Sequence, residues 1–255
     1  PESRIPKLEP RNQMQGPTMQ RIHSITILAV LAAAVSCGVC RAAEYDQAKL
    51  IDVLQSAAPS AEKALACKHL AICGKQEAVP ALAALLPDAD LSSWARIALE
   101  AIPGEAADAA LREAMGKLQG RLLVGVINSL GVRRDGKAVD ALIARLKDAD
   151  ADVASVSALA LGRIGGDAAT QALEASLATA AEGVRSAVAE GCILCAERLA
   201  AAGKTADAVR IFTSVTKASV PTQRVLEATR GLILVQGSAG VPLLREQLQS
   251  SDKAR

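Results

Sequence analysis

The chain has 255 residues, 51% hydrophobic and 22% charged, with only three aromatic side chains, Tyr45, Trp94 and Phe212. So few aromatic residues argue against an all-β sandwich or barrel, which is rich in them, and against a surface that stacks sugars or single-stranded nucleic acid. The high hydrophobic content excludes wholesale disorder. Because 53 residues are alanine, the composition favours an Ala- and Leu-rich helical protein.

The first 43 residues differ from the rest of the chain. Residues 1–18 begin with Pro1, carry four prolines and are expected to lie outside the fold as a leader. Residues 19–43 contain a basic residue, then an apolar stretch, then the small residues Ala42 and Ala43. This order is typical of a secretory signal peptide cleaved at Ala42 and Ala43. We therefore expect a bacterial protein that is periplasmic or secreted.

The apolar stretch of this signal is shorter than the ~20 residues that cross a bilayer, so no stable membrane span is expected. Lipoprotein anchoring at Cys37 is the alternative. Without residues 1–43 the chain has 24 basic and 25 acidic side chains. Such a balance gives no basic field, so neither nucleic acid nor an anionic membrane is an expected partner.

Residues 44–255 repeat one plan. Each unit has an Ala/Leu-rich helix with apolar residues at i, i+3 and i+4, then a glycine, then a second helix. The glycines follow one another at intervals of 30 to 37 residues: Gly74, Gly104, Gly136, Gly166, Gly203 and Gly237. Glycine adopts the left-handed conformation that ends a helix and allows a tight turn. In the loops between units, Asp90, Asp150 and Thr222 are the expected N-caps.

Two first helices end in a recognisable motif, A-L-E-A-I-P-G at 98–104 and A-L-G-R-I-G at 160–165. This motif resembles the HEAT-repeat family, in the short form named from phycobilisome lyases, and the resemblance covers roughly 61–255. It implies an all-α fold, a right-handed α-solenoid of stacked helical hairpins. Residues 196–215 are more similar to a tetratricopeptide hairpin, which also gives stacked hairpins.

The end of the chain repeats an earlier lead-in, since QSSDKAR at 249–255 matches DLSSWAR at 90–96. We therefore expect the array to be truncated as a further repeat begins. The helix at 241–248 would then present Val241, Leu244 and Leu248 without a neighbour, and the protein could self-associate there.

No catalytic, cofactor or metal site is predicted. Cys192 and Cys195 form a C-x-x-C inside an Ala-rich helix, without a thioredoxin-like βαβ pattern. We expect both cysteines to be buried thiols of the core. A disulfide between them, or a redox or metal-binding role, is the alternative. Cys67 and Cys73 lie about three repeats away, on the order of 30 Å, too far to complete a zinc site.

Arginines recur near the start of the first helices: Arg96, Arg121, Arg185 and Arg224. We expect them to form a structural ladder by pairing with carboxylates of the neighbouring turn, with ligand contact as the alternative. Two further arginines stand together in Arg133-Arg134-Asp135, which is interpreted as a solvated turn.

The resemblance implies that the second helices line the concave surface of the solenoid. The position after the buried anchor of each second helix then forms a row of solvent-facing residues: Ala83, Arg112, Ile143, Glu174, Arg210 and Arg245. Arg112, Glu174, Arg210 and Arg245 are therefore candidate contacts for a protein partner whose identity the sequence does not give. An extended acidic segment would be met mainly by Arg210 and Arg245, and ordinary solubilising charges are the alternative.

These features predict an exported, non-catalytic scaffold for protein–protein interaction. One alternative is an accessory repeat domain of a larger extracytoplasmic enzyme. Another is lyase- or chaperone-like handling of a cofactor, which the resemblance to phycobilisome lyases implies but the export signal disfavours.

The signal peptide can be tested by intact-mass analysis of the exported protein. We expect the mature N-terminus between Ala42 and Tyr45, because small residues follow the apolar stretch there and a charged helix then begins. An exported form that retains residues 21–34 would contradict this prediction.

Overall fold

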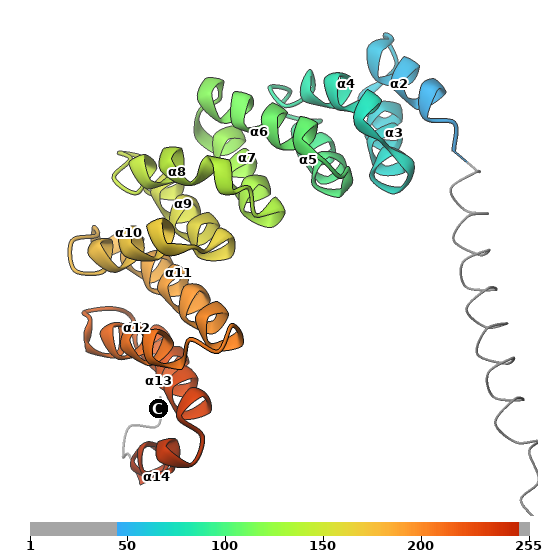
Figure 1. Ribbon diagram of the computed structural model, residues 1–255. Helices are drawn as coiled ribbons and strands as arrows, with labels where there is room; N and C mark the ends of the chain where they lie inside the picture. The colour runs from blue at the N-terminus through green and yellow to red at the C-terminus, as the bar shows by residue number, and fades with distance from the viewer. Residues whose placement is uncertain (1–44, 250–255) are drawn as a thin grey trace, which may run out of the picture. The chain divides into compact units, whose positions relative to one another are not determined.

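A computed structural model describes residues 45–249. The expected leader, signal peptide and cleavage site lie outside the described residues. Within them, every regular element is helical. The unit that begins at Gln47 is compact, and Figure 1 shows its hairpins stacked one after another. The all-α solenoid expected from the sequence is confirmed.

The helices fall into two sets. The first helices are α3 (Ser60–Cys73), α5 (Ser92–Ala101), α7 (Gly120–Arg133), α9 (Ala151–Ile164), α11 (Glu182–Ala201) and α13 (Thr222–Gln236). The second helices are α4 (Val79–Ala83), α6 (Glu105–Lys117), α8 (Val139–Arg145), α10 (Asp167–Leu177), α12 (Thr205–Lys217) and α14 (Val241–Gln249). Helix α2 (Gln47–Gln55) precedes them, and 3₁₀ turns open α4, α8 and α14: η1 (Gln76–Ala78), η2 (Gly136–Ala138) and η3 (Gly237–Gly240).

The turns between paired helices use glycine in most repeats. Gly104, Gly165 and Gly203 have φ of 99°, 74° and 77°, values that a side chain rarely adopts. The first and third turns differ from the expectation. Gly74 is extended, with φ of −67°. In the third turn Arg134 takes the left-handed position with φ of 57°, and Gly136 opens the following 3₁₀ turn. A residue with a Cβ can therefore close the same hairpin, at the cost of some backbone strain.

The predicted N-caps have mixed outcomes. Asp150 is confirmed, because its carboxylate accepts the backbone N–H groups of Asp152 and Val153. The prediction for Asp90 is wrong, since Asp88 accepts hydrogen bonds from the backbone N–H groups of Asp90 and Leu91 before α5 begins. Thr222 is also wrong, because it is already the first residue of α13 and its side chain caps nothing.

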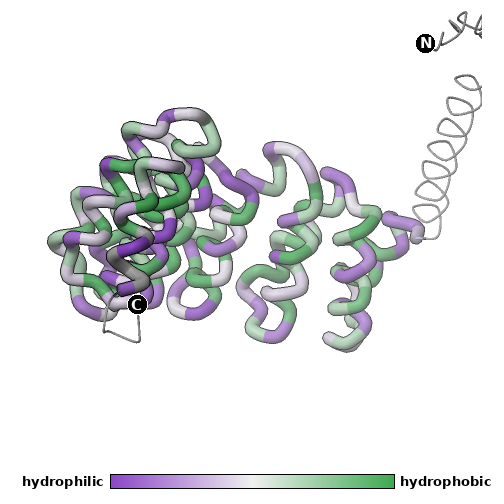
Figure 2. Tube along the Cα trace, turned by 90° about the horizontal axis from the view of Figure 1, so that it is seen from below, coloured by the Kyte–Doolittle hydropathy of each residue, from purple (hydrophilic) through white to green (hydrophobic). Residues whose placement is uncertain are grey.

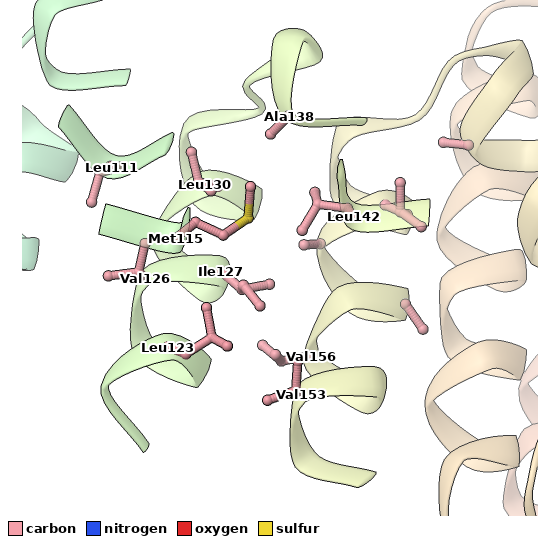
Figure 3. Packing of buried hydrophobic residues seen from close by; sticks show 14 of the residues in the cluster. Leu111, Met115, Leu123, Val126, Ile127, Leu130, Ala138, Leu142, Val153 and Val156 are labelled. Carbon is pink, nitrogen blue, oxygen red and sulfur yellow. The ribbon is translucent and has the colours of Figure 1, made fainter. Parts of the chain in front are cut away.

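A continuous hydrophobic core runs between the two sets of helices. Each second helix from α4 to α10 inserts a leucine at an equivalent position, and all four side chains are 0% exposed: Leu82, Leu111, Leu142 and Leu173. Figure 3 shows two of them against side chains of α7 and α9. In Figure 2, hydrophobic and hydrophilic positions alternate along the helices, as expected for helices buried on one side.

The first helices approach one another backbone to backbone. A Cβ placed on Gly162 of α9 would lie 2.7 Å from the Cα of Gly191 in α11, and one on Gly131 of α7 would lie 2.9 Å from the Cα of Ala160. Real Cβ atoms essentially never come so close to a backbone atom. Small residues at these points therefore set the spacing of α7, α9 and α11.

The second helices contact one another less than the first helices do. In Figure 1, α4, α8, α10 and α12 follow the outer edge of this curved unit, while α7, α9 and α11 follow its inner edge. We call the first helices the inner layer and the second helices the outer layer. The expectation that the second helices line the concave surface is wrong, because the closely spaced glycine-bearing helices occupy the inside of the curve.

Gly162→Ala should destabilise the protein by about 1–3 kcal/mol, because the added methyl group must push α9 away from α11. Gly116→Ala is the matched control, since nothing lies within 4 Å of a Cβ at that helical position. Alanine there should be neutral or stabilise by up to about 1 kcal/mol. Urea unfolding of both variants checks the difference, and equal midpoints would contradict backbone contact at Gly162.

Candidate functional site

The inner layer carries the exposed apolar side chains. Among the described residues, the large hydrophobic side chains with prominent exposure lie on first helices, except Val241: Leu65, Ile72, Trp94, Ile97, Val132 and Leu234. Four of them gather on the neighbouring helices α3 and α5. We call Leu65, Ile72, Trp94 and Ile97 the apolar patch; their exposed fractions run from 41% to 58%. Because α3 and α5 pack against each other, these exposed apolar side chains mark a candidate interaction surface.

Cationic side chains accompany the apolar patch. Lys68 lies on α3 between Leu65 and Ile72, at helical spacings of three and four residues, and Arg121 lies in the first turn of α7. Both are exposed, and neither forms an ion pair with a residue that the structure describes. Their charges are therefore available to a partner.

Arg96, which lies beside the patch on α5, forms hydrogen bonds with the neighbouring repeat. Its guanidinium donates hydrogen bonds to the carbonyl of Gly125 at 3.0 Å and to Ser129 Oγ at 3.1 Å. Ser129 in turn donates to Glu100 Oε1 at 2.6 Å, and Arg96 lies 4.0 Å from Glu100. Gly125 makes room for the guanidinium, since a Cβ there would lie 2.7 Å from Arg96 Nε. Burial lowers the pKa of Arg96, and the contacts fix α5 against α7.

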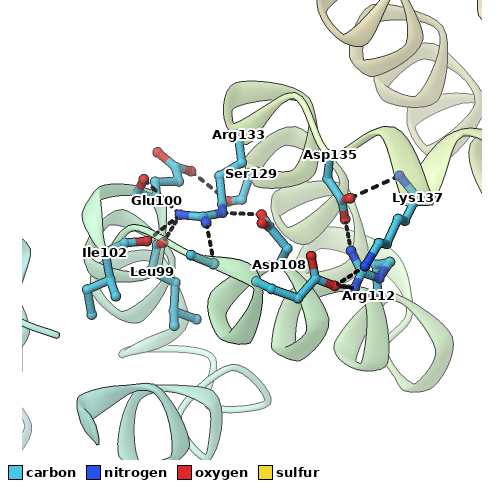
Figure 4. Close-up of polar contacts among 11 residues, drawn as sticks. Leu99, Glu100, Ile102, Asp108, Arg112, Ser129, Arg133, Asp135 and Lys137 are labelled. Atoms are coloured by element: carbon cyan, nitrogen blue, oxygen red, sulfur yellow. Dashed lines mark hydrogen bonds and ion pairs between the residues drawn. The ribbon is translucent and has the colours of Figure 1, made fainter. Parts of the chain in front are cut away.

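Arg133 forms the densest polar contact of the described chain with the preceding repeat (Figure 4). It donates to the backbone carbonyls of Leu99 at 2.7 Å, Ile102 at 2.6 Å and Gly104 at 3.0 Å, and its Nε pairs with Asp108. The carbonyls of Leu99 and Ile102 belong to the end of α5, where the helix leaves carbonyls without partners and where positive charge is favoured. The carbonyl of Gly104 lies directly before α6.

The interpretation of Arg133-Arg134-Asp135 as a solvated turn is wrong. The Arg133 side chain is 8% exposed and that of Asp135 is 4% exposed, and of the three only Arg134 is exposed. Asp135 accepts from the Lys137 N–H and pairs with Arg112. The turn is buried because it docks against the hairpin before it.

Equivalent arginines recur at the ends of the next first helices. Arg198 of α11 donates to the carbonyls of Arg163 and, at 2.7 Å, Ile164, at the end of α9. Arg163 of α9 donates to Asn128 Oδ1 of α7 at 2.7 Å. This series, Arg133, Arg163 and Arg198, was not predicted from the sequence. A signal was present in the sequence, since each of these arginines stands three to five residues before a glycine of the repeat pattern.

The four arginines expected as a ladder have different surroundings. Arg224 pairs with Glu190 of the preceding first helix at 2.5 Å and with Glu227 at 2.6 Å. Arg96 reaches forward to α7, as described. Arg185 donates to the Ala180 carbonyl at 3.1 Å, which is not a carboxylate. Arg121 is exposed and forms no side-chain hydrogen bond or ion pair within residues 45–249. The structure therefore does not join these four residues into one series.

The candidate partner residues of the second helices lie on the outer layer. Arg112 pairs with Asp135 and Glu105, and Glu174 pairs with Arg210 of the next second helix. Arg210 and Arg245 are exposed. Glu174 and Arg210 thus form an ion pair between consecutive repeats. Arg112 pairs with Asp135 in the turn that follows α7.

A cleft of about 440 Å³ lies between α10 and α12. Its lining has three acidic side chains, Asp167, Glu174 and Asp207, and three basic ones, Arg198, Lys204 and Arg210. Within 45–249, no three His, Cys, Asp or Glu side chains are grouped so that they could hold a metal ion. In the same range, no helix combines the length and apolarity that crossing a bilayer requires.

The cysteines of the described chain are free thiols. Cys67, Cys192 and Cys195 are buried and Cys73 is partly buried. Burial raises the pKa of Cys67 to about 11 and also raises the pKa of Cys192 and of Cys195. Raised pKa values keep these thiols protonated near neutral pH, which disfavours nucleophilic or redox chemistry.

Comparison with known proteins supports the repeat assignment. The family model described as HEAT repeats matches residues 119–192, from the residue before α7 into α11. The matched stretch contains the motif at 160–165, on which the resemblance to HEAT repeats was based. No curated protein matches the chain.

Solved structures of repeat type are also similar. The crystal structure of one engineered protein is 20% identical, covers 77% of this chain and 98% of its own, and has a TM-score of 0.46. A second engineered protein is 21% identical, with coverage of 80% and 64% and a TM-score of 0.46. A designed armadillo repeat protein is 17% identical, with coverage of 73% and 100% and a TM-score of 0.43.

Arg133→Met should lower the free energy of unfolding by about 2–4 kcal/mol, because it leaves Asp108 and the carbonyls at the end of α5 buried without their donor. Arg121→Met, at an exposed position of the same helix, should stay within about 0.5 kcal/mol of the parent. Urea unfolding measures both. Equal losses for the two variants would contradict the role assigned to Arg133.

Proposed function

We propose that this protein is an exported, non-catalytic scaffold that binds a protein partner along its inner layer. The observation that carries the proposal is the gathering of exposed apolar side chains on first helices, above all in the apolar patch. The HEAT repeats at 119–192 support it, because stacked helical repeats create extended surfaces that proteins use for binding.

The outer layer offers less for such a partner. Its candidate residues Arg112 and Glu174 are half-buried and engaged in ion pairs within the chain. A charged side chain that already has an intramolecular partner contributes little to binding, because one contact replaces another. Export is proposed from the signal-peptide pattern of residues 19–43 and is tested by the mass of the mature protein.

Photo-crosslinking in the organism that makes the protein tests which layer binds. A photo-reactive residue at Ile97, on the inner layer, should yield a covalent adduct with the partner. The same residue at the exposed Ala175 of α10, on the outer layer, is the matched control and should yield none. Trp94→Ala should abolish the Ile97 adduct, because it removes the largest side chain of the apolar patch.

The double variant Arg210→Glu, Arg245→Glu is a second test of which layer binds the partner. It should leave the Ile97 adduct unchanged, because both arginines lie on second helices. Loss of the adduct in this variant with helicity unaltered, or an adduct at Ala175 alone, would assign binding to the outer layer.

A further inference from the structure

We infer that the partner presents an acidic amphipathic helix, whose apolar side chains pack on the apolar patch and whose carboxylates reach Lys68 and Arg121. This inference rests on the proposed scaffold function and adds the chemistry of the partner. It follows from the size of the patch, from its place in the solenoid and from the charges beside it.

The size of the apolar patch suits a helix better than a second copy of the chain. Four half-exposed side chains of this kind present roughly 400 Å² of apolar surface. A standard stable interface buries about 800 Å² on each partner. An amphipathic helix that lays residues i, i+3 or i+4 and i+7 on a groove needs only such a small area.

The apolar patch is not the face on which another repeat would stack. Helix α2 packs against α3 and α4 and buries Leu54 to 4% exposure, so the stacking face before α3 is already covered. On the other side, α5 packs against α7. The patch side chains remain exposed although their helices have neighbours on both sides, so the patch is open to a partner rather than to the array.

The charges beside the patch favour an anionic partner. Lys68 lies within the patch on α3, and Arg121 stands at the start of the adjoining α7; both are exposed and unpaired in the described chain. The exposed carboxylates Glu62, Asp88 and Asp90 precede the apolar residues of α3 and α5, whereas Lys68 lies among those residues. A partner helix on the patch therefore meets Lys68 within the contact itself, which favours a carboxylate there and disfavours a basic side chain.

Trp94 reports on this site directly, because it is the single tryptophan of the chain and belongs to the patch. The full chain is titrated with three synthetic helical peptides. One has Leu at i, i+3 and i+7 on a Glu-rich background, the second replaces Glu with Lys, and the third replaces Leu with Ser. Only the first should shift the Trp94 emission to shorter wavelength and saturate, with affinity that falls as salt screens the charges.

Variants separate the charge and apolar contributions. Lys68→Glu and Arg121→Glu should each lower the affinity for the acidic peptide by at least about fivefold, because attraction becomes repulsion. The double variant should bind the Lys-rich peptide more tightly than the acidic one. Lys147→Glu, at an exposed loop position, is the matched control and should leave the affinity within about twofold. Ile97→Ser should remove the emission shift without affecting helicity, since Ile97 is exposed.

Several outcomes would overturn the inference. They are equal binding of the Glu-rich and Lys-rich peptides, absence of any response, and a free protein whose Trp94 emission is already that of a buried indole. The last result would mean that residues 1–44 or a second copy covers the patch, and light scattering separates these two. If the Ile97 adduct forms but no preference for acidic peptides appears, the inference fails and the scaffold function stands. If no adduct forms, the function itself fails.

Discussion

Contact between the backbones of neighbouring first helices is the constraint on which the other features depend. Gly131, Gly162 and Gly191 bring α7, α9 and α11 together until their backbones touch. The second helices contact one another less than these first helices do. A stack whose two layers have different spacings must curve toward the closer layer, so these glycines decide which helices line the inside. They thereby decide which residues a partner can reach.

Arg133, Arg163 and Arg198 link the same neighbouring first helices. Each extends from the end of one first helix to the previous one, near the points where glycine allows close approach. Two of them use carbonyls that a helix end leaves unbonded, and the buried guanidinium satisfies several at once. The glycines permit the approach and the arginines fix the offset between repeats. This division explains why Arg133 is buried although it is the last residue of its helix and stands next to a turn.

Much of the fold could be predicted because its signals are local. The glycine spacing and the apolar periodicity identify the hairpins, and Asp150 stands before its helix as a cap should. The identity of the inner layer was not predictable in this way, because it depends on distances between helices about 30 residues apart. The burial of Arg133 depends likewise on carbonyls of the preceding repeat, which no periodicity within its own helix reveals.

The candidate site could be predicted only in part. Trp94 and Ile97 stand opposite the buried positions Ala95, Ala98 and Leu99 of α5, so their helical positions mark them as exposed apolar residues. Trp94 and Ile97 were not predicted as site residues, because the second helices were expected on the concave side. Once the layers are assigned, the same periodicity identifies the patch.

The acceptors of Arg133 and Arg198 are main-chain oxygens for the most part, and a main-chain oxygen is present whatever residue stands there. A unit that ends its first helix at the same place offers the same carbonyls to the next arginine. The junction between units therefore tolerates sequence change on the accepting side. Units of this chain can diverge, be duplicated or be exchanged during evolution while each junction keeps its geometry, and the inner surface is free to change with them.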